Sequence, residues 1–414
     1  MAIKIALASL GCKLNQAEME SMARRLLAAG YQLSSEAPDI YILNTCTVTA
    51  QADSKSRNLL RRARRRYPAA MLVATGCYAE QALEVLTEII GGSGWVVPNR
   101  AKPEIPEMLA EIALPNDGVG SGSSPVLERT RTLVKIQDGC NSFCNYCIVP
   151  LVRGREASRP VDEIVAEVAS RVAGGYREVV LTGVKIGAYR EADTGLVGLV
   201  RRILRETEVA RLRLSSLQPL EITPELMAIF ADGRLCPQLH LCLQSGSDPV
   251  LRGMGRGYTT ADYAAAVEMV RRAAPEVAIT TDVMVGFPGE SDADFEASYE
   301  FCKKLELARI HVFSYSRRAG TAAADYPGQV AEGIKRGRSQ RLLDLAAASA
   351  DRFQRRFAGQ ISPVLFERRV GGIWSGLSPN YIKVYARSAR DLTNAIVNVR
   401  LGDGYRDGRW GELV

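Results

Sequence analysis

Three cysteines lie close together in the segment DGCNSFCNYC, with the spacing C-x3-C-x2-C: Cys140, Cys144 and Cys147. Three thiolates on one short loop can bind three irons of a [4Fe–4S] cluster and leave the fourth iron open for a substrate or cofactor. A structural zinc site would need a fourth Cys or His nearby, but both histidines of the chain, His240 and His311, lie far downstream. The spacing therefore favours an iron–sulfur site over a zinc site.

Three further cysteines, Cys12, Cys46 and Cys77, are far apart in the sequence, but each follows a short β-rich run. The runs are IKIALA, DIYIL and AMLVAT, and each is followed by amphipathic helical sequence. This alternation predicts parallel strands joined by right-handed crossovers. The carboxyl ends of such strands share one edge of the sheet, so the topology predicts that these three thiols meet there as a second metal-binding triad.

The other three of the nine cysteines, Cys236, Cys242 and Cys302, lie on strand or helix patterns and are best explained by core packing. An odd number of cysteines argues against a disulfide framework. The N-terminal MAIKIALASLGC reads as a strand without a signal-peptide cleavage site. No apolar run reaches the roughly 18 residues of a membrane span. We therefore expect a cytoplasmic protein that does not associate with membranes.

The elements that must position the cysteines predict an α/β fold in three parts. Residues 1–114 form a three-layer parallel-sheet domain, and PNDGVGSGSS marks a linker at 115–125. In 126–357 six strand-like runs alternate with helices, which predicts a partial (β/α)6 TIM-like barrel with its function at the C-terminal strand ends. Alternating runs separated by Gly-containing turns in 358–414 predict a small antiparallel β-barrel.

The net charge of +7 is unevenly distributed, because six arginines fall within the ten residues from Arg57 to Arg66. An anionic partner such as RNA explains this run, and a solvated helix face is the alternative.

The cysteine loop after the run TLVKIQ resembles the signature of radical S-adenosylmethionine (radical SAM) enzymes. In that superfamily the open iron chelates the methionine amino and carboxylate groups, and Cys140, Cys144 and Cys147 match the ligands of this catalytic cluster. Tyr146 matches the aromatic position that lies against the adenine. The loop GFPGE lacks the Lys-Ser/Thr of a phosphate-binding P-loop, so we interpret it as a tight turn beside the cofactor.

The same resemblance suggests further cofactor contacts. Thr182 and Gly183 occupy the strand-end segment that binds the methionine amino group through backbone carbonyls. Ser215, Ser216 and Gln244 end later strands and could reach the ribose or the methionine part, with strand-end capping as the alternative. Three arginines after the cluster loop could bind the cofactor carboxylate or an RNA phosphate, or form surface salt bridges: Arg153, Arg155 and Arg159.

The segments LGCKLNQAE, NTCTVTAQAD and TGCYAEQ resemble the N-terminal domain of methylthiotransferases, in which three such cysteines hold an auxiliary [4Fe–4S] cluster. The barrel blocks also resemble that family, and the C-terminal barrel resembles its RNA-binding TRAM domain. GCKLNQAE is closest to the enzymes that act on N6-threonylcarbamoyladenosine, although Lys185 stands where a His is common. Enzymes for dimethylallyladenosine or for a ribosomal-protein aspartate are the alternatives.

The resemblance implies methylthiolation of carbon 2 of the modified adenosine at position 37, in the anticodon loop of tRNA. One S-adenosylmethionine would methylate sulfur at the auxiliary cluster, and another would supply a 5′-deoxyadenosyl radical. An electron donor and a sulfur source, neither identified by the sequence, are expected as partners, and DNA is not. A non-catalytic RNA-binding iron–sulfur sensor is the rival from another class.

Overall fold

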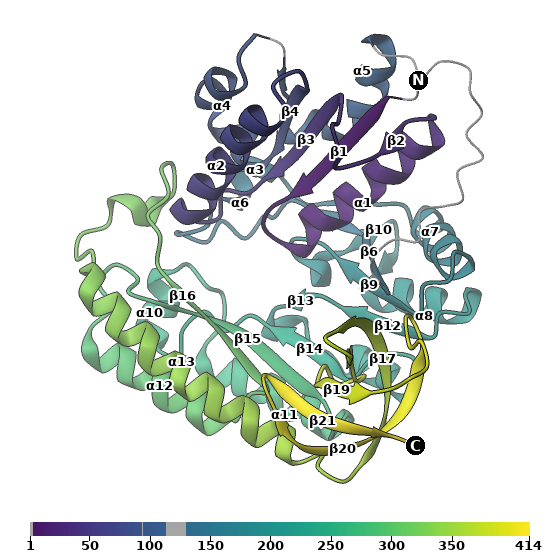
Figure 1. The fold of residues 1–414 in the computed structure, drawn as a ribbon. Coiled ribbons are helices and arrows are strands. Elements are labelled where there is room, and N and C mark those ends of the chain that lie inside the picture. The colour runs from purple at the N-terminus through teal and green to yellow at the C-terminus, as the bar shows by residue number, and fades with distance from the viewer. Residues whose placement is uncertain (1–2, 93, 113–129) are drawn as a thin grey trace. The chain divides into compact units, whose positions relative to one another are not determined.

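The structure is a computed structural model that describes residues 3–92, 94–112 and 130–414 (Figure 1). Its contacts divide the chain into two compact units. Unit 1 comprises Met1–Val126, Asp138–Ala157 and Ser316–Ala324, and unit 2 comprises Leu127–Gln137, Ser158–Tyr315 and Asp325–Val414. The predicted linker at 115–125 lies outside the described residues, so the boundaries drawn around it stay predictions. No described helix is long and apolar enough to cross a membrane.

Unit 1 contains a parallel five-stranded sheet with the order β2-β1-β3-β4-β5. Its strands are β1 (Lys4–Ser9), β2 (Gln32–Leu33), β3 (Ile40–Thr45), β4 (Met71–Gly76) and β5 (Trp95–Val96). The three strands expected from the sequence are β1, β3 and β4, which confirms the parallel sheet. The two short edge strands were not expected, because two residues give no detectable alternation.

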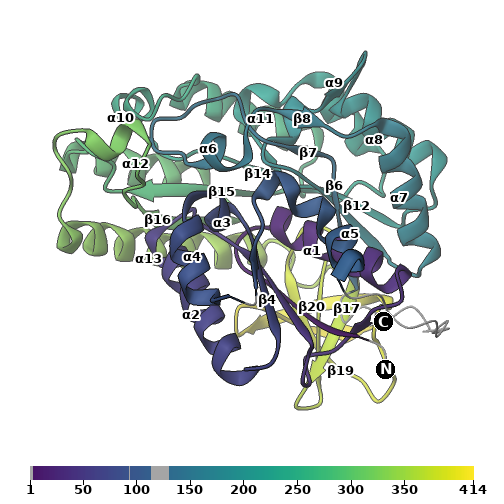
Figure 2. The same ribbon diagram turned by 90° about the horizontal axis from the view of Figure 1, so that it is seen from above.

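Helices cover both faces of this sheet, as Figure 2 shows from above. The helices are α1 (Lys13–Ala28), α2 (Ala50–Arg66), α3 (Cys77–Gln81), α4 (Leu83–Ile90), the 3-10 turn η1 (Asn99–Glu104) and α5 (Ile105–Ile112). Alternate strand residues point to opposite faces. Ile42 therefore packs with α1 and α5, whereas Leu43 packs with α2 and α4. The predicted three-layer arrangement is confirmed.

The segment Asp138–Ala157, which contains the clustered cysteines, belongs to unit 1 by its contacts. It includes α6 (Val149–Arg153), and the short strands β7 (Gln137–Asp138) and β8 (Ala157–Ser158) lie at its two ends. The segment Ser316–Ala324 joins it, since the Ala323 amide donates to the Asn145 carbonyl at 2.8 Å. Sequence order alone places this loop in the barrel domain, so its contacts with unit 1 are a finding of the structure.

Unit 2 contains two parallel sheets, with the orders β12-β9-β6 and β13-β14-β15-β16. The strands are β6 (Arg131–Lys135), β9 (Glu178–Thr182), β12 (Arg211–Leu214), β13 (Ser216–Leu217), β14 (Gln238–Leu241), β15 (Ala278–Val285) and β16 (Arg309–Ser314). They correspond to the six expected runs, the third of which is divided between β12 and β13. The predicted series of parallel βα units is confirmed, and its strands form these two sheets.

Helices follow these strands and cover their outer side. The main ones are α7 (Val161–Ala173), α8 (Leu196–Glu206), α9 (Pro224–Ala228), α10 (Asp248–Gly253), α11 (Thr260–Ala273), α12 (Asp292–Leu305) and α13 (Glu332–Arg355). Short elements connect them: η2 (Ile186–Ala188), β10 (Arg190–Glu191), β11 (Thr194–Gly195), η3 (Pro219–Glu221), η4 (Ile229–Ala231) and η5 (Ala322–Asp325). Reciprocal capping boxes, in which Ser291 and Asp294 bond each other's backbone, fix the start of α12 and similarly α11.

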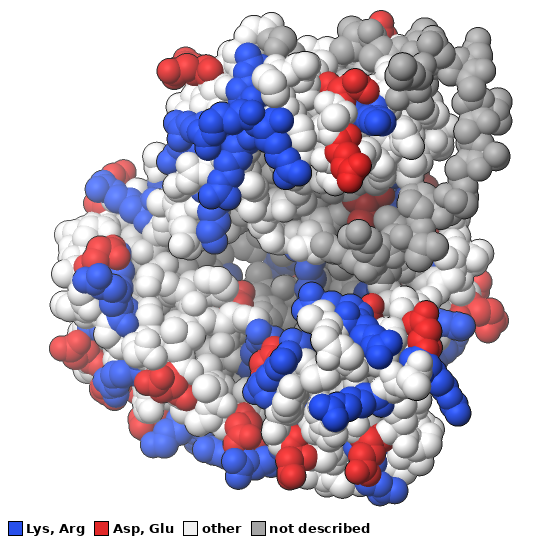
Figure 3. Space-filling model, in the orientation of Figure 1, with Lys and Arg blue, Asp and Glu red and all other residues white. Residues whose placement is uncertain are grey.

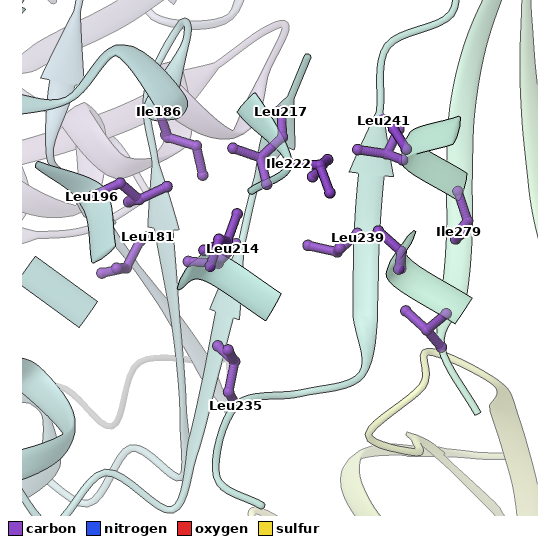
Figure 4. Close-up of a cluster of buried hydrophobic side chains, with 14 of the residues drawn as sticks. Leu181, Ile186, Leu196, Leu214, Leu217, Ile222, Leu235, Leu239, Leu241 and Ile279 are labelled. Atoms are coloured by element: carbon purple, nitrogen blue, oxygen red, sulfur yellow. The ribbon is translucent and has the colours of Figure 1, made fainter. Parts of the chain in front are cut away.

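The core of unit 2 lies between the strands and these helices. Figure 4 shows Leu181 and Leu214 of the strands beside Ile186 and Leu196 of the covering segments, and Leu239 farther along the same core toward Leu241 and Ile279. The strand leucines Leu181 and Leu239 have no exposed surface. Burying such side chains contributes roughly 1.5–3 kcal/mol each, so the apolar face holds the strands in place and leaves their other face for chemistry.

The C-terminal strands of unit 2 close into a barrel with the order β17-β18-β19-β21-β20. They are β17 (Ile361–Val370), β18 (Ile373–Leu377), β19 (Lys383–Arg387), β20 (Ile396–Tyr405) and β21 (Gly408–Leu413). The predicted barrel is confirmed with one correction: β19 and β21 pair in parallel, not antiparallel. Closing five strands, an odd number, requires at least one parallel pair.

Candidate iron–sulfur and cofactor sites

The first cysteine triad lies at the carboxyl edge of the unit 1 sheet. Thr45 pairs with Gly76 on neighbouring strands, so Cys46 and Cys77, the next residues, leave the sheet side by side. Cys12 follows the adjacent strand β1. Cys46 and Cys77 are only 2% and 5% exposed, whereas Cys12 is exposed. The structure therefore places all three cysteines at the same edge of the sheet, and their role as a metal-binding triad stays a prediction.

Backbone conformation brings these thiols together. Gly11 has φ +97°, and a Cβ there would lie 2.7 Å from Cys46 Sγ. Gly76 has φ +98°, and a Cβ there would lie 2.3 Å from Asn44 Oδ1. Only glycine tolerates both the left-handed conformation and the lack of space. The Gly-Cys pairs in LGC and TGC are therefore required by the local geometry.

Two buried thiols of the first triad, those of Cys46 and Cys77, hold their protons more tightly than a free cysteine does. Burial raises the pKa of Cys46 to about 11. Burial also raises the pKa of Cys77, against the opposing effect of Arg153 and Lys102. Metal ions bind the thiolate, so binding must release these protons and is favoured by raising the pH.

The second triad occupies a loop that is closed by backbone contacts. The Cys140 amide donates to the Gly154 carbonyl at 3.1 Å, and the Cys147 amide donates to the Cys144 carbonyl at 2.9 Å. Phe143, between the cysteines, has φ +40°, a conformation that costs energy for a side chain of this size. The guanidinium of Arg155 lies 4.4 Å from the centre of its ring. The half-buried cysteines are thus held on a constrained loop.

The described cysteine triads do not have the close ligand spacing of a preformed single-ion site. A tetrahedral zinc with bonds of about 2.3 Å brings its sulfur ligands within about 4 Å of one another. Among the described residues, only His240, Asp282 and His311 place three candidate ligand atoms within 4.8 Å of one another. Neither cysteine triad meets this limit. The donors of each triad are all sulfur, the ligand type that holds iron–sulfur clusters.

Most of the candidate cofactor residues lie at strand ends in unit 2. Thr182 ends β9, and the Ser215 amide donates to the neighbouring Leu181 carbonyl at 3.0 Å. The Ser215 hydroxyl is buried, yet no described residue gives it a hydrogen-bond partner. Such an orphaned group is expected where a ligand supplies the partner. Ser216 begins β13 and is half-buried.

Backbone geometry distinguishes three other candidates. A Cβ on Gly183 would lie 2.9 Å from the Gln137 carbonyl oxygen, so this strand end is closely packed. Gln244 has φ +68° and bonds β15 on both sides through the Asp282 carbonyl and the Met284 amide. Tyr146 belongs to the cysteine loop of unit 1 and is half-buried. The candidate residues are thus divided between the two units.

The structure also shows the environments of the GFPGE turn and of two arginines that follow the cysteine loop. The Glu290 carboxylate accepts from the Gly286 amide at 2.6 Å, so GFPGE is a tight turn, as expected. Arg153 forms ion pairs with Glu18 and Asp138, but its side chain is buried, so these are not the surface salt bridges suggested for it. Arg159 pairs with Glu167 at 2.7 Å, which supports the salt-bridge alternative.

Sequence reasoning missed a polar group inside unit 2. His240, Asp282 and His311 lie on β14, β15 and β16, and His240 Nε2 is 3.3 Å from Asp282 Oδ2. Burial lowers the pKa of His240, but hydrogen bonds to Asp282 and Cys242 outweigh it and raise the pKa to about 10. A sequence pattern could have predicted this cluster: on these strands polar residues recur at every second position, while the opposite face is apolar.

Comparison with known families and folds is consistent with this geometry. The sequence profile of the Radical SAM superfamily matches residues 134–302, and that of the Uncharacterized protein family UPF0004 matches residues 4–97. A radical S-adenosylmethionine methyltransferase from Kitasatospora setae has a similar fold, with a TM-score of 0.58 and 16% identity over 78% of this chain and 74% of that one. Fold and site define a radical SAM enzyme that uses S-adenosylmethionine and iron–sulfur clusters.

Proteins of similar sequence show to which family of radical SAM enzymes the chain belongs. The threonylcarbamoyladenosine tRNA methylthiotransferase MtaB of Chlamydia pneumoniae is 36% identical, over 99% of this chain and 97% of that protein. MtaB of Bacillus subtilis is 33% identical over the same shares. The tRNA-2-methylthio-N(6)-dimethylallyladenosine synthase of Geotalea uraniireducens is 34% identical over 98% of both chains. The chain belongs to the family of radical SAM tRNA methylthiotransferases, transferases with two [4Fe–4S] clusters.

Proposed function

We propose that this protein attaches a methylthio group to carbon 2 of N6-threonylcarbamoyladenosine at position 37 of tRNA. The observation that carries the proposal is the presence of two separate cysteine triads in a chain that matches MtaB relatives over 99% of its length. One triad lies at a sheet edge and the other on a local loop. Because tRNA is the substrate, we place the reaction in the cytoplasm.

The two triads would have different tasks. Cys140, Cys144 and Cys147 would hold the cluster with an open iron, where S-adenosylmethionine, once bound and reduced, supplies a 5′-deoxyadenosyl radical. The first triad would hold the auxiliary cluster, where sulfur is delivered. A radical is required because the C–H bond at carbon 2 of adenine is too weakly acidic for a side-chain base to deprotonate.

The residues at the strand ends would bind and orient the cofactor. The orphaned hydroxyl of Ser215 supports a polar contact there. Ser216 begins β13, and Gln244 follows β14 and bridges to Val283 of β15. Thr182 and Gly183 would present backbone carbonyls, and Tyr146 would pack against the adenine. The buried core behind these strands keeps them rigid, which orients the cofactor at little entropic cost.

Two surfaces would bind the tRNA. Figure 3 shows a group of basic side chains on unit 1 near α2, whose Arg61, Arg62, Arg65 and Arg66 are exposed. The C-terminal barrel, which we take as TRAM-like, carries the half-buried rings of Tyr405 and Trp410, whose centres lie 5.2 Å apart. Arginines bind phosphates, and aromatic rings stack on the splayed bases of RNA loops such as the anticodon loop.

The test is mass spectrometry of tRNA nucleosides from a deletion strain. We expect loss of 2-methylthio-N6-threonylcarbamoyladenosine and accumulation of its precursor, with restoration by the wild-type gene but not by a Cys140→Ala variant. Loss of the dimethylallyl product instead would assign the other tRNA substrate. Unchanged tRNA together with loss of a methylthio-aspartate would assign a protein substrate. Absence of 5′-deoxyadenosine formation by the purified, reduced protein would favour a non-catalytic sensor.

A further inference from the structure

Arg153, the last residue of α6, has an environment unlike that of a surface arginine. Its side chain is only 2% exposed. Nη1 donates to Glu18 Oε1 at 3.0 Å and to the Asp138 carboxylate at 2.9 and 3.1 Å. Nη2 donates to the Asn15 side-chain oxygen and to Glu18. The remaining nitrogen, Nε, lies 3.3 Å from Cys77 Sγ and donates to it. Every nitrogen of the guanidinium therefore has an acceptor.

These acceptors come from the segments that carry both cysteine triads. Asn15 and Glu18 lie on α1, which begins immediately after Cys12. Asp138 lies two residues before Cys140. All of them belong to unit 1. One guanidinium thus connects the loop of the second triad with two of the three cysteine segments of the first.

A second contact supports the same connection. Asn99 Nδ2 donates to the Val152 carbonyl at 2.8 Å and lies 3.7 Å from Cys77 Sγ. The side chains of Ile148 and Val152 pack against Cys77 in a small buried cluster. The segment of α6 therefore contacts Cys77 directly. Arg153 and Asn99 make polar contacts with its sulfur, and Ile148 and Val152 make apolar ones.

The charges explain why an arginine is required. Glu18 also accepts from Lys102 Nζ at 2.5 Å, so two carboxylates balance two buried cations. This balance offsets the cost of burying the Arg153 charge, and the forked shape of the guanidinium allows contacts with two carboxylates and a sulfur at the same time. A lysine, with a single nitrogen, cannot make all of them.

We propose that Arg153 is a positioning residue that holds Cys77 against the loop of the second triad and raises the reduction potential of the cluster on the first triad. The inference rests on the proposed assignment of Cys12, Cys46 and Cys77 as ligands. Reduction adds negative charge to a cluster, and an N–H···S hydrogen bond from a cation stabilises that charge. Removing this bond should therefore make the cluster harder to reduce.

The experiment uses full-length protein in which Cys140, Cys144 and Cys147 are Ala, so that only the first cluster gives a signal. The midpoint potential is measured by EPR in samples poised at a series of potentials. We expect Arg153→Gln to shift the potential to more negative values, Arg153→Lys to shift it less, and the control Arg25→Gln, at an exposed ion pair of α1, to leave it unchanged. Iron and sulfide content of each variant shows whether the cluster is assembled.

Hydrogen-bonded protons provide a second readout, which does not depend on any Arg153 variant assembling its cluster. The reduced cluster with Arg153 intact should show a proton coupling in pulsed EPR that disappears on exchange into D2O. Absence of that coupling, or Arg153 variants with a full cluster and an unchanged potential, would overturn the inference while leaving the proposed function intact. Absence of any cluster in the parent with Arg153 intact would instead overturn the ligand assignment and the inference with it.

Discussion

The position of a cysteine in the first triad depends on the backbone conformation of its neighbours as well as on the chemistry of its thiol. Cys77 becomes a candidate ligand because Gly76 turns the chain at the end of β4 in a conformation that side chains rarely adopt. The hydroxyl of Thr45 accepts from the Ala79 amide at 3.1 Å and thereby fixes the start of α3. The residue before a ligand thus determines where the ligand points.

Replacing Gly76 with Ala tests this dependence. The new Cβ would lie 2.3 Å from Asn44 Oδ1 at a φ of +98°, and the strain should cost about 1–3 kcal/mol and displace Cys77. We expect the reconstituted iron content to fall from about eight to about four per chain, since each triad would hold one cube. The matched control is Gly92→Ala, where the Cβ meets nothing within 4 Å. Equal iron contents in the two variants would contradict the role of Gly76.

At the level of elements, helix α2 combines a structural and a binding role. Thr49 caps its first turn, and Arg64, Arg65 and Arg66 lie in its last turn, where a positive charge is favourable. Arg57 donates to the Tyr78 hydroxyl at 2.6 Å, so it is tied to the fold. The exposed arginines of α2 remain available for an anionic partner.

Neutralising the exposed arginines of α2 should weaken tRNA binding in a salt-dependent way. Removing one ion pair between an arginine and a phosphate should reduce the salt slope by roughly 0.7–0.9, so Arg61→Gln, Arg62→Gln and Arg65→Gln together should reduce it by roughly 2–3. Binding is measured by filter retention from low to high salt. The control replaces three exposed arginines of α8 and α11 with Gln: Arg201, Arg205 and Arg272. An unchanged slope would assign the α2 run to simple solvation.

Strands β14 and β15 are joined by the ion pair between His240 and Asp282. The folded-state pKa of His240, about 10, lies above the ordinary value of 6.5. The pair therefore contributes its full stability below about pH 6.5, and this contribution falls as the pH rises and is lost near pH 10. We expect Asp282→Asn to lower stability by about 1.5–3 kcal/mol at pH 6 and by almost nothing at pH 10.

Thermal unfolding of unit 2 at several pH values measures this effect. The control is Asp193→Asn at an exposed position between β10 and β11. A stability difference between Asp282→Asn and wild type that is constant from pH 6 to pH 10 would show that His240 is not held in its charged form.

At the scale of the whole molecule, we expect the two cysteine triads to serve one reaction in separable tasks. The triple variant with Cys12, Cys46 and Cys77 changed to Ala should still form 5′-deoxyadenosine under dithionite, because the ligands of the second triad lie on one local loop. It should form no 2-methylthio product on tRNA. The corresponding variant of Cys140, Cys144 and Cys147 should lose both activities. Both products are measured by mass spectrometry, and methylthiolation by the first variant would make the first triad structural.

The sequence by itself determined the local features of this protein. The spacing of Cys140, Cys144 and Cys147, the strand-cysteine order of the first triad and the six βα runs all express interactions between residues close in the chain or repeating with a fixed period. Parallel topology then forces the carboxyl ends of β1, β3 and β4 to one edge. The fold class and the meeting of Cys12, Cys46 and Cys77 could therefore be predicted.

Only the tertiary structure decided which side chains distant in the sequence form ion pairs and hydrogen bonds with one another. Arg153 was equally compatible with a cofactor, an RNA phosphate or a surface salt bridge, because its partners Glu18 and Cys77 lie 135 and 76 residues away. The packing of the loop after β7 with unit 1 could not be predicted for the same reason, because its contacts are with residues distant in the sequence. The parallel pairing of β19 with β21 also follows from closure of the barrel. Burial and pairing are properties of packing, and no short window of sequence contains them.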